Sequence, residues 1–256
     1  MPILETLSAA QILLAVGALL LGAFVQGAVG FAYGLIATPL LLWAGLPLPE
    51  AVGAVGGAGL VQTATGCWKF RRHIVWRDLP GLAAGRTLGL PFGILVMAWL
   101  TAGGAVLMKQ GVGFVVLGTV LLISLLRPKP RSRVSRRWVA PVGLSSGVMS
   151  GVTGIGGPPL VLWVVAHDWS TKRGRVFLWV LFLQLMPIQL ALMWWKFGGN
   201  VGWAIGLGWA MAPGVIWATT LGAKLGSRWS RERMRRVILG VLVVLALASI
   251  ASPWLG

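Results

Sequence analysis

Hydrophobic residues occur along this chain in long runs, which short polar or basic connections separate. A helix needs about 20 apolar residues to cross a bilayer. Six runs reach or approach this length, at residues 50–68, 79–100, 104–126, 176–196, 201–223 and 237–254. The pattern predicts an all-α polytopic membrane protein. Composition agrees, because 57% of the residues are hydrophobic and only 11% are charged, whereas soluble domains are about one quarter charged.

Four further runs are shorter and form two pairs. Residues 8–26 and 31–45 make the first pair, and residues 138–151 and 158–166 make the second. The run 8–26 nearly reaches the length of a span, whereas the other three are too short to cross alone. Each pair is therefore expected to enter the membrane and return as a broken helix hairpin. No Lys or Arg precedes the first run, so we expect a retained helix and not a signal peptide.

Basic residues account for the net charge of +17, and most of them lie between the apolar runs. They form four groups, within residues 69–77, 127–137, 172–175 and 224–236. This distribution follows the positive-inside rule, so the four connections are expected in the cytoplasm, where they meet anionic lipids. It does not indicate nucleic-acid binding. Both termini are then expected on the non-cytoplasmic side.

Similar sequences recur in the two halves of the chain. PLLLW at residues 39–43 matches PLVLW at 159–163, and Gln62 followed by WKF at 68–70 matches Gln189 followed by WKF at 195–197. The charge rule puts the first WKF in the cytoplasm and the second outside, so the repeats are predicted to have inverted topology, as in many secondary transporters.

Each repeat is predicted to consist of one broken hairpin followed by three transmembrane helices. The first repeat covers residues 1–126, a basic cytoplasmic linker covers 127–137, and the second repeat covers 138–256.

Small residues recur every four positions in one helix of each half. This spacing keeps them on one helix face, where a neighbouring helix can approach closely, so we predict tight helix packing there. The residues are Gly81, Gly85, Gly89 and Gly93, and then Gly202, Gly206, Ala210, Gly214, Ala218, Gly222 and Gly226.

Helix-breaking residues interrupt both hairpins at their tips. The first tip reads VQGAVGFAYG, residues 25–34, and the second reads GVTGIGGPP, residues 151–159. Non-helical backbone inside a membrane must be buried in protein or line a polar cavity. We therefore predict that the two tips meet near the bilayer middle. Amide groups at the start of the returning helices would then favour an anion. The alternative is that the glycines only allow the hairpins to pack.

Few polar side chains occur within the apolar runs, and each is a candidate ligand. Gln26 precedes the first tip and Thr153 lies in the second. Gln62 and Gln189 could either donate hydrogen bonds to a ligand or join helices. Arg86 lies about two turns inside its helix, where an arginine is a functional candidate, although it could instead extend to the cytoplasmic surface.

Acidic residues, in contrast, fall only in connections or at the ends of runs. This argues against a cation site and against a proton relay through carboxylates. Cys67 is the only cysteine, and the two histidines fall in basic connections, where they are expected in solvent. Because the sequence offers neither metal-ligand spacing nor a nucleophile with a base, we expect no enzyme, metal or cofactor. The acidic residues are Glu5, Glu50, Asp78, Asp168 and Glu232.

The segments GAVGFAYGLIATPLLLW and GVTGIGGPPLVLW resemble the two glycine-rich motifs of the TauE/SafE sulfite exporter family. The first departs from the more glycine-rich form of many members by having Phe31, Ala32 and Tyr33. The resemblance implies an exporter of sulfite, sulfoacetate or a related organosulfonate in the bacterial inner membrane. It also implies a substrate pocket formed by the two tips. The tip residues concerned are Gly27, Gly30, Phe31, Tyr33, Gly34, Gly154, Gly156, Gly157 and Pro158.

The leading hypothesis is therefore a secondary transporter that exports a small sulfur-containing anion by alternating access. The alternative is a channel or an importer for another small oxyanion. The sequence leaves the identity of the anion, the coupling ion and the oligomeric state open.

Overall fold

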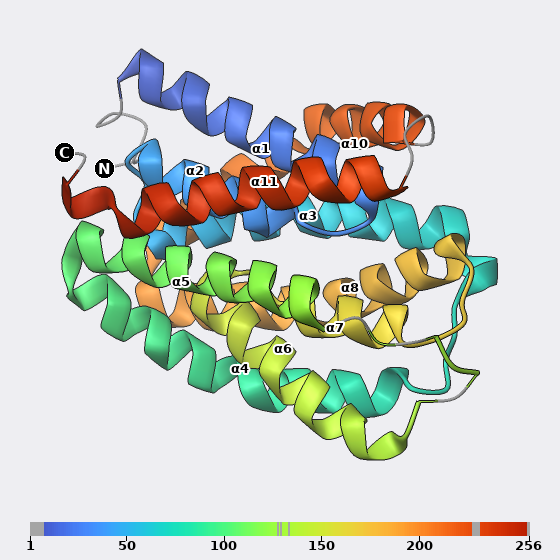
Figure 1. The fold of residues 1–256 in the computed structure, drawn as a ribbon. Coiled ribbons are helices and arrows are strands. Elements are labelled where there is room, and N and C mark those ends of the chain that lie inside the picture. The colour runs from blue at the N-terminus through green and yellow to red at the C-terminus, as the bar shows by residue number, and fades with distance from the viewer. Residues whose placement is uncertain (1–7, 127, 129, 133, 227–230, 255–256) are drawn as a thin grey trace.

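The protein is seen here in a computed structural model that describes residues 8–126, 128, 130–132, 134–226 and 231–254, with only the backbone described at 231–235. Every regular element in this part of the chain is a helix (Figure 1). Several residues considered above lie outside the described backbone or side chains. They are Glu5, Arg127, Lys129, Arg133, Arg228, Arg231, Glu232, Arg233 and Arg235.

Five α-helices make up the N-terminal half of the described chain. They are α1 (Ala9–Val29), α2 (Tyr33–Trp43), α3 (Leu48–Phe70), α4 (Leu79–Ala102) and α5 (Gly104–Leu125).

Six α-helices follow in the C-terminal half. They are α6 (Val139–Thr153), α7 (Gly157–Val165), α8 (Thr171–Phe197), α9 (Gly199–Ala210), α10 (Ala212–Gly226) and α11 (Arg231–Ile250). Short 3₁₀ turns occur at Arg71–His73, Arg136–Trp138 and Ser252–Trp254.

Several of these helices have the length and the apolar composition of membrane spans. Within the described residues, α1, α4, α5 and α8 each meet both conditions, and a fifth span results if α9 and α10 are counted together. The prediction of an all-α polytopic membrane protein is thus confirmed. The predicted spans 50–68 and 237–254 correspond to α3 and α11, which are 23 and 20 residues long but are not among the helices that meet both conditions.

The predicted single helix over residues 201–223 is wrong. It is divided into α9 and α10, whose axes are bent by 54°. Pro213 follows the break, and a proline there has no N–H to continue the helical hydrogen bonding and crowds the preceding turn. The helix therefore bends at this point, whereas α4 stays a single helix around its internal Pro91.

Both predicted hairpins are present, and each contains a tight break between its helices. Gly30, with φ of 91°, caps the C-terminus of α1, and Gly154, with φ of 74°, caps that of α6. Glycine adopts this left-handed conformation without steric cost. The two tips touch, because a Cβ built on Gly34 would lie 3.1 Å from the carbonyl oxygen of Gly154.

The basic connections gather at one end of the helix bundle. His167, between α7 and α8, lies 3.9 Å from Asp78, which precedes α4, and it pairs through its backbone with Arg131 of the α5–α6 connection. Lys69 of α3 and Lys224 of α10 line one shared cavity. In Figure 1 these connections lie at the right, and the start of α1 and the turn at Ser252–Trp254 lie at the left.

His167 itself corrects the expectation that both histidines are in solvent. Its side chain is buried, and Nδ1 lies 2.8 Å from the carbonyl oxygen of Trp163 in the last turns of α7. The ring also stacks on that of Trp169, with the centroids 4.3 Å apart. His167 is therefore a packing residue of the basic end, whereas His73 is exposed.

Glycines bring α4 into close contact with α6. A Cβ on Gly147 of α6 would collide with the carbonyl oxygen of Arg86, and one on Gly93 of α4 with that of Val148. The predicted tight packing is confirmed for this helix pair. In the second predicted stripe, Gly222 and Gly226 of α10 pack closely against α1. Gly206 lies in α9, before the break, and a Cβ there would meet no atom within 4 Å.

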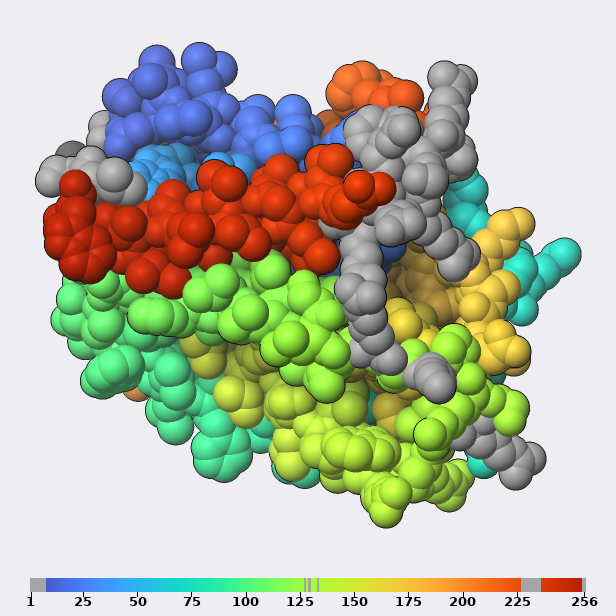
Figure 2. All heavy atoms as spheres, in the orientation of Figure 1, coloured from blue at the N-terminus to red at the C-terminus, as the bar shows by residue number. Residues whose placement is uncertain are grey.

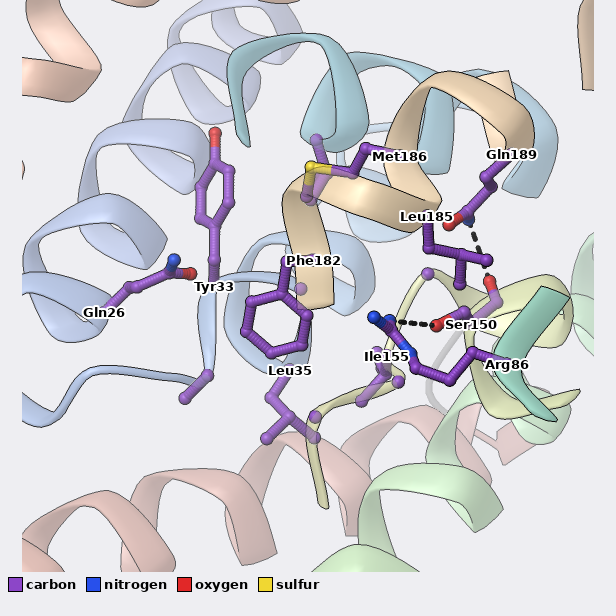
Figure 3. A pocket seen from close by; sticks show the side chains of 16 residues that line it. Gln26, Tyr33, Leu35, Arg86, Ser150, Ile155, Phe182, Leu185, Met186 and Gln189 are labelled. Atoms are coloured by element: carbon purple, nitrogen blue, oxygen red, sulfur yellow. Dashed lines mark hydrogen bonds between the residues drawn. The ribbon is translucent and has the colours of Figure 1, made fainter. Parts of the chain in front are cut away.

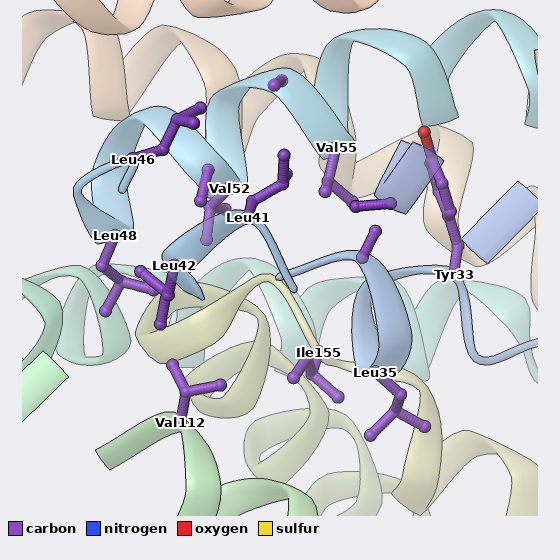
Figure 4. Close-up of a cluster of buried hydrophobic side chains, with 14 of the residues drawn as sticks. Tyr33, Leu35, Leu41, Leu42, Leu46, Leu48, Val52, Val55, Val112 and Ile155 are labelled. Atoms are coloured by element: carbon purple, nitrogen blue, oxygen red, sulfur yellow. The ribbon is translucent and has the colours of Figure 1, made fainter. Parts of the chain in front are cut away.

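The hydrophobic core lies where α2 packs between α3, α5 and the second tip (Figure 4). Ile155 of that tip is buried in the same cluster as Leu35 and Leu42 of α2, Val52 of α3 and Val112 of α5. On one face of the molecule, α5 and α11 run side by side (Figure 2). The core thus supports the point where the tips meet.

Candidate functional site

A cavity lies where the two hairpin tips meet α3, α4 and α8 (Figure 3). It has about 540 Å³ of empty space, part of which is open to the outside. The residues that line it are Gln26, Ala32, Tyr33, Gly34, Leu35, Val55, Arg86, Ser150, Gly154, Ile155, Gly156, Gly157, Phe182, Leu185, Met186 and Gln189. We call this space the central cavity.

Arg86 is the charged side chain of the central cavity. It projects from α4, whose glycines let α6 approach, so its guanidinium meets two serines of α6. Nε donates to Oγ of Ser146 at 3.0 Å, and Nη2 lies 3.4 Å from Oγ of Ser150. Nη1 donates to the carbonyl oxygen of Leu181 in α8. These contacts fix the guanidinium in one orientation.

The position of Arg86 decides between the two alternatives considered for it. Only 2% of the residue is exposed, so the side chain does not extend to the cytoplasmic surface. Its Cζ lies 5.5 Å from the ring centroid of Phe182, within the range of a cation–π contact. No acidic side chain of the described residues lines the cavity or forms an ion pair with Arg86. The buried positive charge therefore has neutral protein partners.

Ser146 connects Arg86 to the second tip. Its hydroxyl accepts from Nε of Arg86 and donates to the carbonyl oxygen of Gly156 at 2.6 Å. Gly156 has no room for a side chain, because a Cβ there would overlap Oγ of Ser150. The glycine at this position is thus a requirement of the arginine–serine cluster.

The returning helices α2 and α7 both begin at the central cavity. No side chain of the described chain caps either N-terminus. Tyr33, Gly34 and Leu35 form the first turn of α2 and line the cavity. The N–H groups of such a turn have no partner within the helix and carry partial positive charge. In α7 the donors are fewer than expected, because Pro158 and Pro159 have no N–H.

Neutral polar side chains complete the lining. The hydroxyl of Tyr33 is buried and has no hydrogen-bond partner within the described chain. Nε2 of Gln189 donates to the carbonyl oxygen of Ser150 at 2.9 Å. Gln26 faces the cavity from α1, on the side away from Arg86 (Figure 3). Donors thus lie on both sides of the space.

Eight of the fourteen candidate residues line the central cavity together. They are Gln26, Tyr33, Gly34, Arg86, Gly154, Gly156, Gly157 and Gln189.

The other six candidates lie elsewhere. Gln62 donates to Oγ1 of Thr219 and, with Gly27, lines a different cavity.

Gly30 contacts the side chain of Arg175. Phe31 and Pro158 pack in the protein, and the hydroxyl of Thr153 lies 3.3 Å from the carbonyl oxygen of Met149 in its own helix.

The serines and the apolar wall of the central cavity are not among the residues predicted from the sequence. Ser146 and Ser150 are four residues apart, so they share one face of α6. That spacing in an uncharged run was a signal that could have identified them. Phe182, Leu185 and Met186 of α8 had no such signal, because apolar residues fill all faces of that helix.

The chemistry of this arrangement suits a small anion. One guanidinium, the first-turn amides of α2 and the Tyr33 hydroxyl provide donors, and donors around a cation stabilise oxyanions by charge-assisted hydrogen bonds. The described residues contain no group of three or more His, Cys, Asp or Glu that could hold a metal ion.

Comparison with known proteins agrees with a transporter. The chain matches the family described as Sulfite exporter TauE/SafE over residues 14–249. It is similar to the Probable sulfite/organosulfonate exporter TauE of Cupriavidus necator, with 29% identity over 235 residues, which cover 91% of this chain and 90% of that protein. No solved structure matches the chain. This chain belongs to the TauE/SafE family of sulfite exporters.

Proposed function

We propose that this protein exports a small sulfur-containing anion across the bacterial inner membrane. The substrate is sulfite, sulfoacetate or a related organosulfonate, and it binds in the central cavity between the two tips. The relative in Cupriavidus necator, whose name states sulfite or organosulfonate export, supports this substrate class.

The observation that carries the proposal is the uncompensated charge of Arg86. A buried cation is costly unless it is paired with an opposite charge as well as hydrogen-bonded. Its partners here are two hydroxyls and one carbonyl oxygen. A bound anion would supply the missing charge, and the guanidinium can donate to two of its oxygens at once.

The remaining lining fits the two ends of an organosulfonate. Its sulfonate oxygens would accept from Arg86 and from the first-turn amides of α2. Its short carbon chain would contact the apolar wall of Phe182, Leu185 and Met186. Sulfite, which has no carbon chain, would use the polar part alone.

Alternating access is the mechanism that we propose for release. Gly147 of the second hairpin packs on the Arg86 carbonyl of α4, and with the two halves exchanged Gly27 of the first hairpin packs on the Thr219 carbonyl of α10. Likewise, Gly89 packs on Leu144 as Gly222 packs on Phe24. This recurrence supports inverted repeats at residues 1–126 and 138–256, whose relative rocking would expose the central cavity to each side in turn.

The membrane potential favours movement of an anion in the direction of export. An anion that leaves a cell with a negative interior gains about 2.3 kcal/mol per charge for each 100 mV. Coupling to a second ion is then unnecessary, which is consistent with the lack of carboxylates in the cavity lining of the described residues.

Counterflow in proteoliposomes tests the proposal. Vesicles that contain the protein and are loaded with unlabelled sulfoacetate should accumulate labelled sulfoacetate transiently and with saturation, and vesicles with the Arg86→Gln variant should not. An ohmic anion current without counterflow would identify a channel instead. Accumulation of sulfate or another oxyanion, but not of sulfite or sulfoacetate, would replace the proposed substrate class.

A further inference from the structure

A second cavity opens at the basic end of the protein, between α1, α3, α8 and α10. It has about 940 Å³ of empty space, and its lining includes three basic residues, Lys69, Arg175 and Lys224. We call it the basic vestibule. Its lining contains no acidic side chain of the described residues.

The first hairpin tip separates the basic vestibule from the central cavity. Gln26 lines the central cavity, and the next residue, Gly27, lines the vestibule. The two spaces thus adjoin the same turn of α1 on different faces. An anion in the vestibule would have to pass this tip to reach Arg86.

Arg175 is the basic residue that touches the tip. The charge pattern predicts it in a basic connection, but it lies within α8, and its side chain packs on Gly30. Its Nη2 lies 3.5 Å from the carbonyl oxygen of Ala28, the upper limit for a hydrogen bond. The Nε atom is buried and has no hydrogen-bond partner among the described residues.

A second unpartnered donor lies one turn further along α8. Trp179 is 5% exposed, lines the vestibule, and its indole Nε1 has no hydrogen-bond partner in the described part of the chain. Cζ of Arg175 lies 6.0 Å from the Trp179 ring centroid. Buried donors of native proteins are nearly always paired. Nε of the Arg175 guanidinium and the neighbouring indole N–H of Trp179 are both unpaired among the described residues, which indicates that a negatively charged hydrogen-bond acceptor is missing here.

We propose that the basic vestibule contains a second anion site, formed by Arg175 and the indole N–H of Trp179. Its ligand is a small oxyanion such as a sulfonate, which Lys69 attracts from the basic end. The site holds the anion against the first tip before it passes to the central cavity. That last role rests on the proposed function, whereas anion binding in the vestibule does not.

Thiol labelling inside the vestibule tests this site. Thr65 lines the vestibule and is exposed, so a Thr65→Cys substitution in a Cys67→Ala background gives one reactive thiol. Two methanethiosulfonate reagents of similar size are compared, one with a sulfonatoethyl group and one with a trimethylammonioethyl group. The anionic reagent is expected to react faster, since its own sulfonate occupies the proposed site.

Replacing Arg175 should remove this preference. In the Arg175→Gln variant we expect the ratio of anionic to cationic labelling rates to fall by about two- to fivefold, the scale of one local charge interaction. Arg175→Lys should retain most of the ratio. The matched control is Arg173→Gln, an exposed cation of the same helix outside the vestibule lining. Equal falls in the Arg175→Gln and Arg173→Gln variants would overturn the proposal, because they would reflect only the surface potential.

Protection by sulfoacetate separates this site from the central cavity. Sulfoacetate should slow labelling in the Arg86→Gln background and should fail to do so once Arg175→Gln is added. If Arg86→Gln alone abolished the protection, sulfoacetate would bind only centrally and the vestibule site would be wrong. If the labelling preference depended on Arg175 while counterflow was absent, the site would stand and the transport proposal would fail.

Discussion

Nε of Arg86 donates a hydrogen bond to Oγ of Ser146 across the interface of α4 and α6, at a distance of 3.0 Å. The same hydroxyl donates to the carbonyl oxygen of Gly156 at 2.6 Å. One serine thus connects the buried cation to the tip whose returning helix begins at the central cavity. The position of the positive charge and the position of the second tip are therefore set by the same contact.

Replacing Ser146 tests this connection. In a Ser146→Ala variant, Arg86 loses a fixed partner and the Gly156 carbonyl loses its donor. A hydrogen bond to a charged group is worth about 1.5–3 kcal/mol, so we expect the Kd for sulfoacetate to rise by about tenfold or more. Isothermal titration calorimetry on purified protein measures this. The control is Ser145→Ala, because the Ser145 hydroxyl is exposed and bonds only within its own helix. Equal affinities of the two variants would contradict the role given to Ser146.

Two neighbouring glycines of the second tip should respond differently to alanine. A Cβ on Gly156 would overlap Oγ of Ser150, whereas one on Gly157 would lie 3.5 Å from the Phe182 ring, an ordinary contact. We expect Gly156→Ala to destabilise the protein by about 1–3 kcal/mol, as overpacked sites do. Gly157→Ala should fold normally and reduce the space for the anion. Thermal unfolding in detergent, with and without sulfoacetate, distinguishes these outcomes. A Gly156→Ala variant as stable as wild type would be inconsistent with the geometry.

The helix contact between α4 and α6 can be tested through Gly147. A Cβ at this position would collide with the carbonyl oxygen of Arg86, whereas one on Gly118 of α5 would meet no atom within 4 Å. Gly147→Ala should therefore lower stability by about 1–3 kcal/mol. Gly118→Ala should leave stability unchanged or raise it by about 0.4–1 kcal/mol. Denaturation midpoints of the two variants provide the measurement, and the reverse order would refute the close approach of these helices.

Inverted repeats predict which connections face the same side of the membrane. In a Cys67→Ala background, a thiol introduced by Lys172→Cys should be accessible only from the cytoplasm, and one introduced by Asn200→Cys only from outside. A membrane-impermeant maleimide applied to intact cells and to inverted vesicles distinguishes the two sides. Labelling of both thiols from one side would show that α8 does not cross the membrane and would contradict the predicted topology.

The sequence alone allowed much of the helical pattern to be predicted. Apolar runs and basic connections identify the helices, and the glycines with Pro158 and Pro159 identify the second tip, because such residues are tolerated at membrane depth only at a break. The bend between α9 and α10 was missed, since Pro213 lies in an uninterrupted apolar run and similar prolines, such as Pro91, leave their helices continuous.

The direction of individual side chains was harder to predict. Arg86 could have turned to the cytoplasm or to the cavity, and only the glycine contact of α4 with α6 determines that it meets Ser146. Gln62 and Gln189 recur in the repeats, yet Gln62 bonds to Thr219 while Gln189 faces the central cavity. The partner of each of these side chains depends on which helix packs against its face of the helix. A single sequence does not contain that information.

Binding of sulfoacetate to Arg86 variants tests the central claim most directly. By calorimetry, wild type and the exposed-cation control Lys196→Gln should bind with similar Kd. Arg86→Gln should bind at least about tenfold more weakly, because it loses a charge-assisted interaction worth about 1.5–3 kcal/mol. Arg86→Lys should lie between them, since lysine keeps the charge without the two-pronged geometry. Wild-type affinity in the Arg86→Gln variant would contradict an anion site built around this arginine.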